Sequence, residues 1–295
     1  MKKCTYALDA GGSFLKCGLV DDALNVIPGT HDSIAADSAH GTPESIRAAY
    51  HTLAARAAAR AAEAGYEISA VGMDTPGPFE YATGTFRMTH KYTALYGMSV
   101  LPWFAEDLPG IGVHIIHDSA AFILGAAHAL GGKTLRGSVA AVMLGTGLGF
   151  ALMRDGTPLS AANGGPLVSI YRAPLHGKEA EELISARGIV RRYADAAGTD
   201  AGMTNAKEIA MLAKAGDKTA AGVYAETGAL LGELISPILR EYEVHTLLLG
   251  GQISRDSALF VPELECVLNN AEVAIAEAAN ADDAHLVGAA MAAQG

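Results

Sequence analysis

Residues 5–20 read TYALDAGGSFLKCGLV, two short apolar runs joined by a glycine turn. The runs predict strands over residues 4–8 and 14–20, and the acidic turn that follows leads to a third predicted strand, ALNVI at 23–27. The same order returns at 138–153, SVAAVMLGTGLGFALM, before another tight turn and apolar run. The chain therefore opens twice with strand, glycine turn, strand, turn and strand.

Segments that favour helices separate these strands. Residues 43–65 are rich in alanine and end at a glycine, which is typical of a helix C-terminus. Further strands are predicted at 68–76 and 111–116, and a helix is expected directly after the second of them. Later helical segments surround one strand and glycine turn, HTLLLGG at 245–251. Strands that alternate with helices predict an α/β fold, and the repeated opening predicts two similar lobes around a cleft, divided near residue 118.

The composition indicates a compact globular protein. Of 295 residues, 50% are hydrophobic and 18% are charged, and the mean hydropathy is +0.23, values that disfavour disorder. The net charge of −11 argues against non-specific binding to nucleic acids or to anionic membranes. The longest uncharged run, 137–153, contains glycines and is shorter than the ~20 residues of a membrane helix. Three cysteines, Cys4, Cys17 and Cys266, without a CxxC pair or a secretory signal, indicate a reducing compartment, so we expect a cytoplasmic protein.

The two glycine turns are candidate phosphate sites. In DAGGS at 9–13, glycines allow backbone N–H groups to approach a phosphate, Ser13 adds a hydroxyl donor, and Asp9 is placed to hold Mg²⁺ directly or through water. The alternative is a hairpin turn in which Asp9 bonds to its own backbone. The second turn, GTG at 145–147, lacks the spacing of a dinucleotide fingerprint but is still a candidate phosphate cradle.

A candidate general base, Asp118, follows the strand predicted at 111–116. Ligands of α/β folds bind at the carboxyl ends of such strands, where a carboxylate can take a proton from a substrate hydroxyl. Aspartate is also a preferred N-cap, and a helix is expected to begin at once. The sequence is equally compatible with the catalytic and the structural role.

In this order, the motifs resemble those of the ROK family of sugar kinases and repressors, within the actin-like ATPase superfamily. The family's first phosphate motif, DxGGT, is similar to residues 9–13, its PGP turn is similar to residues 76–78, and the aspartate of its NDxN segment falls on Asp118. Its second phosphate motif lies at 145–147 and its later GG pair at 250–251. These similarities run along nearly the whole chain.

The resemblance implies a two-lobed actin-like ATPase fold, which is ribonuclease H-like, with a mixed sheet flanked by helices in each lobe. We expect an N-terminal lobe of residues 1–117, completed by the C-terminal helix 284–295, and a C-terminal lobe of residues 118–283.

The resemblance also implies a glucokinase-like phosphotransferase with an alcohol group as acceptor, which moves the γ-phosphate of ATP to a hydroxyl of a hexose or related sugar. Asp118 is then the general base and Asp9 organises Mg²⁺. Lys16 is either a phosphate ligand or a solvated strand residue. The expected ATP and phosphate contacts are Asp9, Gly11, Gly12, Ser13, Lys16, Gly145, Thr146, Gly147, Gly250 and Gly251.

The departures from the family pattern fall on sugar recognition. The NDxN segment reads HDSA at 117–120, and the family's ExGH sugar motif is absent, its region reading NGGPLVSIYR at 163–172. Glu181 aligns with a later sugar-binding glutamate, so we expect Gly77, His117 and Glu181 to contact the substrate. Because polar groups in a sugar pocket pair with particular hydroxyls, these changes predict an unusual sugar. The cysteine-rich zinc motif of many members is also missing, and we expect no structural zinc.

Two alternatives to a hexose kinase stay open. One is a kinase for an N-acylhexosamine such as N-acetylmannosamine or N-acetylglucosamine, and the other is a non-catalytic sensor of sugar or nucleotide on the same fold. DNA-binding repressors of the family carry a helix-turn-helix before the first strand, whereas Asp9 lies only eight residues after Met1. We therefore expect a small-molecule sugar as partner, no nucleic acid and no membrane, and, from the resemblance alone, a homodimer.

Overall fold

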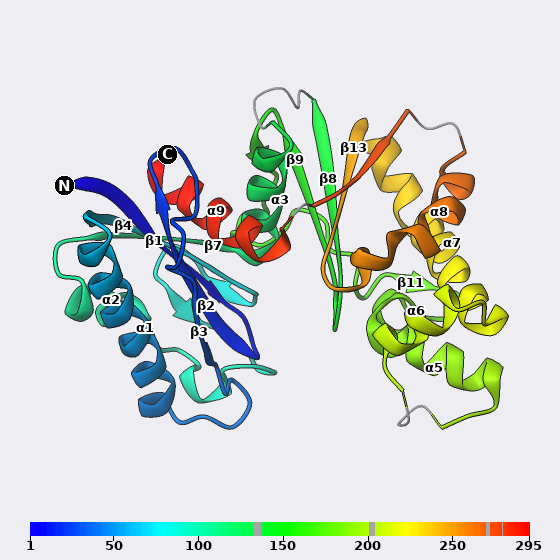
Figure 1. Cartoon of the computed structure of the whole chain (residues 1–295), viewed down its shortest axis with the longest axis horizontal. Helices are drawn as coiled ribbons and strands as arrows, with labels where there is room; N and C mark the ends of the chain where they lie inside the picture. The colour runs from blue at the N-terminus through cyan, green and yellow to red at the C-terminus, as the bar shows by residue number, and fades with distance from the viewer. Residues whose placement is uncertain (132–136, 201–203, 270–271, 279) are drawn as a thin grey trace. The chain divides into compact units, whose positions relative to one another are not determined.

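The chain forms two compact units, each built around a five-stranded sheet (Figure 1). The computed structural model describes residues 1–131, 137–200, 204–269, 272–278 and 280–295. Unit 1 comprises Met1–Ala129, Leu159–Pro166 and Asn280–Gly295, and unit 2 comprises Leu130–Pro158 and Leu167–Ala279. Unit 1 therefore combines segments from both halves of the sequence.

The sheet of unit 1 has the strand order β3-β2-β1-β4-β7. Its strands are β1 (Lys2–Ala10), β2 (Phe14–Asp21), β3 (Asp32–Ala35), β4 (Tyr66–Thr75) and β7 (Gly112–His117). Neighbours among β1, β2 and β3 pair antiparallel, whereas β4 pairs parallel with both β1 and β7. The carboxyl ends of β1, β4 and β7 therefore meet at one edge of the sheet.

Helices cover both faces of this sheet (Figure 1). On one face lies α1 (Pro43–Glu63), with α2 (Leu101–Asp107) beside it. On the other face lie α3 (Asp118–Ala129) and α9 (Ala281–Gln294). The Thr42 hydroxyl caps the start of α1, and Gly65 follows its end with a φ of 79°, as the sequence predicts.

Two glycines allow α3 and α9 to touch through their backbones. A Cβ atom on Gly125 of α3 would lie 1.9 Å from the carbonyl oxygen of Ala284. A Cβ atom on Gly288 of α9 would lie 1.8 Å from the carbonyl oxygen of Ala121. Both distances are far below van der Waals contact, so the two helices cross this closely because glycine stands at both positions.

The sheet of unit 2 repeats the arrangement of unit 1. Its order is β10-β9-β8-β13-β14, with antiparallel pairing of β8, β9 and β10 and parallel pairing of β13 with β8 and β14. The strands are β8 (Ser138–Leu144), β9 (Leu148–Arg154), β10 (Thr157–Pro158), β13 (Val244–Gly250) and β14 (Ala274–Glu277). The helices of this unit are α4 (Ala180–Ile184), α5 (Ala186–Ala197), α6 (Ala206–Lys214), α7 (Lys218–Glu241) and α8 (Val261–Leu268).

Short elements complete both units. They are β5 (Phe79–Glu80), β6 (Thr85–Phe86) and the 3₁₀ helix η1 (Thr93–Leu95) in unit 1, and β11 (Pro174–Leu175), β12 (Lys178–Glu179) and the 3₁₀ helix η4 (Ile253–Leu259) in unit 2. Of the described helices, none is long and apolar enough to cross a bilayer.

The predicted α/β class with two similar mixed sheets is confirmed, but one strand prediction is wrong. ALNVI at 23–27 is a turn with a single bridge, between Val26 and Val20, and the third strand is instead Asp32–Ala35. The Asp21 carboxylate accepts hydrogen bonds from the N–H groups of Ala23 and Asn25, which folds this segment back on itself. The local turn chemistry therefore outweighs the apolar pattern.

Candidate active site

Four side chains gather at the carboxyl ends of the parallel strands of unit 1. Asp9 of β1 and Asp74 of β4 are partners in the strand register, and Thr75 of β4 is the partner of His117 in β7. Asp118 is the next residue and begins α3. The register thus brings the predicted residues Asp9, His117 and Asp118 to one edge of the sheet, together with Asp74, which the sequence did not single out.

Asp118 is held by the residues on either side of it. Its Oδ1 lies 2.7 Å from Nδ1 of His117 and accepts a hydrogen bond from the backbone N–H of Ser119 at 2.6 Å. Burial opposes ionisation, but contact with His117 and the charge of His285 hold the pKa of this carboxyl below its usual value. The carboxylate is therefore ionised at neutral pH, as a general base must be, and its second oxygen lies outside these contacts.

The PGP turn after β4 lies against His117. A Cβ atom on Gly77 would stand 3.7 Å from the His117 ring and 3.6 Å from the Tyr81 hydroxyl. The rings of Tyr81 and His117 are 6.0 Å apart, and a Cβ on Gly164 would lie 2.6 Å from the Tyr81 ring. The structure brings the predicted residues Gly77 and His117 together with Tyr81 and Gly164. The positions of Tyr81 and Gly164 depend on tertiary packing, and no local sequence pattern indicated that they lie at this site.

Three hydrogen bonds to carbonyl groups fix the first glycine turn. The Tyr92 hydroxyl donates to Gly11 at 2.6 Å, the Ser38 hydroxyl to Gly12 at 2.5 Å, and the Ala36 N–H to Ser13 at 2.9 Å. These bonds hold the carbonyl groups, and the donors that the turn can offer to an anion are its backbone N–H groups and the Ser13 hydroxyl.

A lysine that the sequence did not single out, Lys91, extends along this turn. Its Cδ and Nζ atoms lie 2.8 and 3.3 Å from the position that a Cβ would take on Gly12. Lys16, the lysine predicted from the sequence, stands in β2 opposite Asp9 in the strand register. Both lysines thus place positive charge near the first turn.

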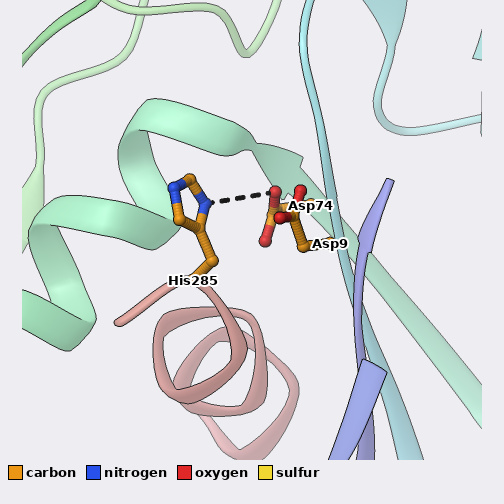
Figure 2. Close-up of side chains that lie close together, drawn as sticks. All are labelled: Asp9, Asp74 and His285. Atoms are coloured by element: carbon orange, nitrogen blue, oxygen red, sulfur yellow. Dashed lines mark ion pairs between the residues drawn. The ribbon is translucent and has the colours of Figure 1, made fainter. Parts of the chain in front are cut away.

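Asp9, Asp74 and His285 form a compact group at the same sheet edge (Figure 2). One ligand atom from each lies within 4.8 Å of the others, and Nδ1 of His285 is 3.5 Å from Oδ1 of Asp74. Burial, and then the charge of Asp9, raises the pKa of Asp74 well above its usual range. Burial alone would lower the pKa of His285, but the surrounding carboxylates, Asp74 first, raise it to about 10. Both shifts reflect a surplus of negative charge in a buried place.

In unit 2, the glycine motifs at 145–147 and 250–251 lie where β8 and β13 end. Gly250 is the register partner of Met143, and a Cβ on Gly251 would lie 2.2 Å from the carbonyl oxygen of Leu144. The structure therefore brings these two predicted motifs together. Among the described residues, no heavy atom lies within 4 Å of the position that a Cβ would take on Gly145.

Glu181 of α4 braces the 145–147 turn. Its Oε2 accepts a hydrogen bond from the N–H of Leu148 at 3.0 Å, and Arg187 donates to its Oε1 at 3.0 Å. The same Oε2 would lie 2.9 Å from a Cβ on Gly147. Glu181 thus belongs to unit 2, whereas the other predicted sugar contacts, Gly77 and His117, belong to unit 1.

Comparison with known proteins finds a match to a family over almost the whole chain. A sequence model of the ROK family matches residues 5–295. No curated protein matches the chain in sequence. A ROK family glucokinase from Streptomyces griseus, solved with glucose and AMPPNP, is 20% identical with a TM-score of 0.78, and 99% of each chain is covered.

Two further solved structures are similar to this chain. A candidate N-acetylmannosamine kinase from Listeria monocytogenes is 18% identical with a TM-score of 0.77, and 99% of this chain and 98% of that chain are covered. A ROK family transcriptional regulator, homologous to the E. coli MLC protein, is 17% identical with a TM-score of 0.82, and 100% of this chain and 78% of that chain are covered. The fold expected from the resemblance is confirmed by these likenesses, which include both kinases and a regulator.

Proposed function

Because the chain belongs to the ROK family, we propose that it is an ATP-dependent sugar kinase, which transfers the γ-phosphate of ATP to a hydroxyl of a hexose or related sugar. The observation that carries this proposal is the Asp118 carboxylate. It stands at the end of β7, its pKa lies below the usual value, and His117 holds one of its oxygens. The carboxylate is therefore ionised at neutral pH and held in place, so it can accept the proton of a sugar hydroxyl.

In the proposed reaction, Asp118 accepts the proton of the sugar hydroxyl through the oxygen that His117 and Ser119 leave outside their contacts. The hydroxyl oxygen forms a bond to the γ-phosphorus as the bond to the β-phosphate oxygen breaks, and ADP leaves. Such transfers depend mainly on positioning and on stabilisation of charge. His117 positions the base, and Gly77, His117 and Glu181 are our assigned contacts to the sugar.

The glycine turns are our assigned phosphate contacts. In unit 1 they are Gly11, Gly12 and Ser13, with Lys16 and Lys91 supplying positive charge nearby. In unit 2 they are Gly145, Thr146 and Gly147, with Gly250 and Gly251 beside them. Backbone N–H groups of glycine-rich turns suit phosphate because no side chain keeps the anion away.

Asp9 is our assigned residue for Mg²⁺, held directly or through water. The residues present fit such an ion, because Asp9 and the buried Asp74 offer carboxylate oxygens, the ligands that Mg²⁺ prefers. When bound with ATP, Mg²⁺ supplies positive charge to the phosphate oxygens.

One narrower variant of this proposal and one alternative to it are also supported. The narrower variant is a kinase for an N-acylhexosamine, which requires that the altered segment 163–172 leave room for an acyl group. The likeness to a candidate N-acetylmannosamine kinase supports this substrate. The likeness to a transcriptional regulator supports a non-catalytic sugar sensor instead. A homodimer is proposed from the family alone, and light scattering would measure it.

The test is ADP release with Mg·ATP over hexoses, N-acylhexosamines, pentoses and polyols, for the wild type and Asp118→Asn. We expect turnover that depends on one sugar class and that falls by roughly 10²–10⁴-fold in Asp118→Asn. The control is Asp107→Asn, since Asp107 also pairs with a histidine, His51, at 2.6 Å but lies at the end of α2. Sugar or nucleotide binding without sugar-dependent ADP release would reject the kinase and favour the sensor.

A further inference from the structure

The buried carboxylate of Asp74 lacks the partners that such a group normally has. Its residue is 0% exposed, and neither Oδ1 nor Oδ2 receives a hydrogen bond from the described part of the chain. Nδ1 of His285 is likewise buried without a hydrogen bond among these residues, at 3.5 Å from Oδ1 of Asp74. Buried polar groups nearly always have hydrogen bonds, and this long ion pair supplies none, so the three atoms indicate an occupant in the group.

The fold holds this group rigidly. Asp9 and Asp74 are register partners on adjacent parallel strands, so their side chains project from the same face of the sheet. His285 reaches them from α9, which packs on β1, β4 and β7 (Figure 2). The His285 ring lies 5.5 Å from the ring of Phe122 in α3. One ligand atom from each of the three residues lies within 4.8 Å of the other two.

Charge also argues for a cation. The group combines two carboxylates with one imidazole in a place where Asp74 has no access to solvent. A divalent cation with a neutral imidazole therefore compensates the full charge of the group once both carboxylates are ionised, whereas a protonated His285 compensates only one of the two.

We propose that Asp9, Asp74 and His285 bind one divalent cation of the manganese, iron, cobalt or zinc class in the absence of nucleotide. Carboxylate oxygens suit Mn²⁺ as well as Mg²⁺, but an imidazole nitrogen suits transition metals and zinc. Three protein donors leave coordination positions open for water or a ligand. This site goes beyond the proposed kinase, which requires Mg²⁺ only together with ATP.

The test is a titration of chelator-treated, nucleotide-free protein with Mn²⁺ and with Co²⁺. The variants are Asp74→Asn and His285→Gln, both close in size to the residues they replace. The matched control is His31→Gln, since His31 also pairs with a carboxylate, Asp283 at 2.7 Å, but does not join a group of three metal ligands among the described residues. Calorimetry gives the stoichiometry, and the visible spectrum of Co²⁺ reports its donors.

We expect one equivalent of metal in the wild type and in His31→Gln, and an affinity at least tenfold lower in Asp74→Asn and His285→Gln. In the wild type alone, pulsed electron paramagnetic resonance of bound Mn²⁺ should show coupling to an imidazole nitrogen, which decides the matter even if a variant fails to fold. Absence of stoichiometric binding, equal affinity in all four proteins, or bound Mn²⁺ without nitrogen coupling would overturn the proposal. ADP release with Mg·ATP is scored separately, so loss of the kinase proposal and loss of the metal site are distinguishable.

Discussion

Nδ1 of His117 lies 2.7 Å from Oδ1 of Asp118, so the last residue of β7 pairs with the first residue of α3. The Ser119 hydroxyl also lies 2.8 Å from the same nitrogen. The pair combines an N-terminal position on a helix with a contact to the imidazole, and both favour the ionised carboxylate. In the proposed kinase, His117 therefore acts on the reaction through the base.

This pairing predicts a change in the pH profile of His117→Asn. The base works only when ionised, so activity falls as the pH drops through the pKa of Asp118. Contact with His117 lowers that pKa, and its removal should move the acid limb of kcat/KM to higher pH. The control is Ser119→Ala, which removes the hydroxyl but keeps the N–H bond to Asp118. An acid limb at the wild-type pH in His117→Asn would contradict this role.

Gly145→Ala should weaken nucleotide binding without affecting the fold. A Cβ at this position meets no described heavy atom within 4 Å, so we expect the free energy of unfolding to change by less than about 0.5 kcal/mol. In the proposed site the added methyl group occupies space that a phosphate needs, and affinity for an ATP analogue should fall about tenfold or more, or ~1.4 kcal/mol. Calorimetry measures the affinity, with Gly222→Ala in α7, another open position, as control. Unchanged affinity would remove this turn from the phosphate contacts.

Lys91→Met should lower affinity for ATP. The Lys91 side chain lies along Gly12, and a charge-assisted bond to phosphate contributes ~1.5–3 kcal/mol, which corresponds to roughly 10- to 100-fold in affinity. Because salt screens such contacts, the difference from the wild type should shrink as ionic strength rises. Lys2→Met is the control, since Lys2 lies over the Tyr66 ring at the start of β1. Equal affinities of Lys91→Met and wild type at low salt would argue against the contact.

Gly288→Ala should destabilise unit 1. Its Cβ would lie 1.8 Å from the carbonyl oxygen of Ala121, a backbone atom that cannot move aside as a side chain does. Overpacking of this kind costs ~1–3 kcal/mol or more of the free energy of unfolding, measured by urea denaturation. Gly222→Ala in an open position of α7 should instead gain about 0.5–1 kcal/mol. Equal stability of Gly288→Ala and wild type would contradict the close approach of the two helices.

Motifs that depend on neighbouring residues could be predicted from the sequence. The two hairpins, their glycine turns and the position of Asp118 between a strand and a helix follow from local patterns of apolar, glycine and acidic residues. The strand prediction for residues 23–27 was wrong because it rested on apolar residues alone. The Asp21 carboxylate accepts hydrogen bonds from the backbone of this segment, and these bonds fold it into a turn.

Residues placed by tertiary contacts were missed. Asp74 looks like an ordinary strand residue until the register of β4 against β1 sets it beside Asp9. His285 is one polar residue in an apolar helix, and nothing local indicates that α9 docks over the same strands. Lys91 reaches Gly12 from a distant loop. Such positions depend on pairings across the chain, which a single sequence does not encode in its local patterns.

The docking of α9 on β1, β4 and β7 has a consequence for synthesis on the ribosome. The first strands of unit 1 leave the exit tunnel early, yet one face of their sheet lacks α9 until residues 281–294 emerge. All of unit 2 is made in the interval, so the part of the protein that is translated first is completed after the part that is translated later. During that time Asp9 and Asp74 lack His285. The proposed metal ion, which all three residues bind, can therefore be bound only after α9 has been synthesised.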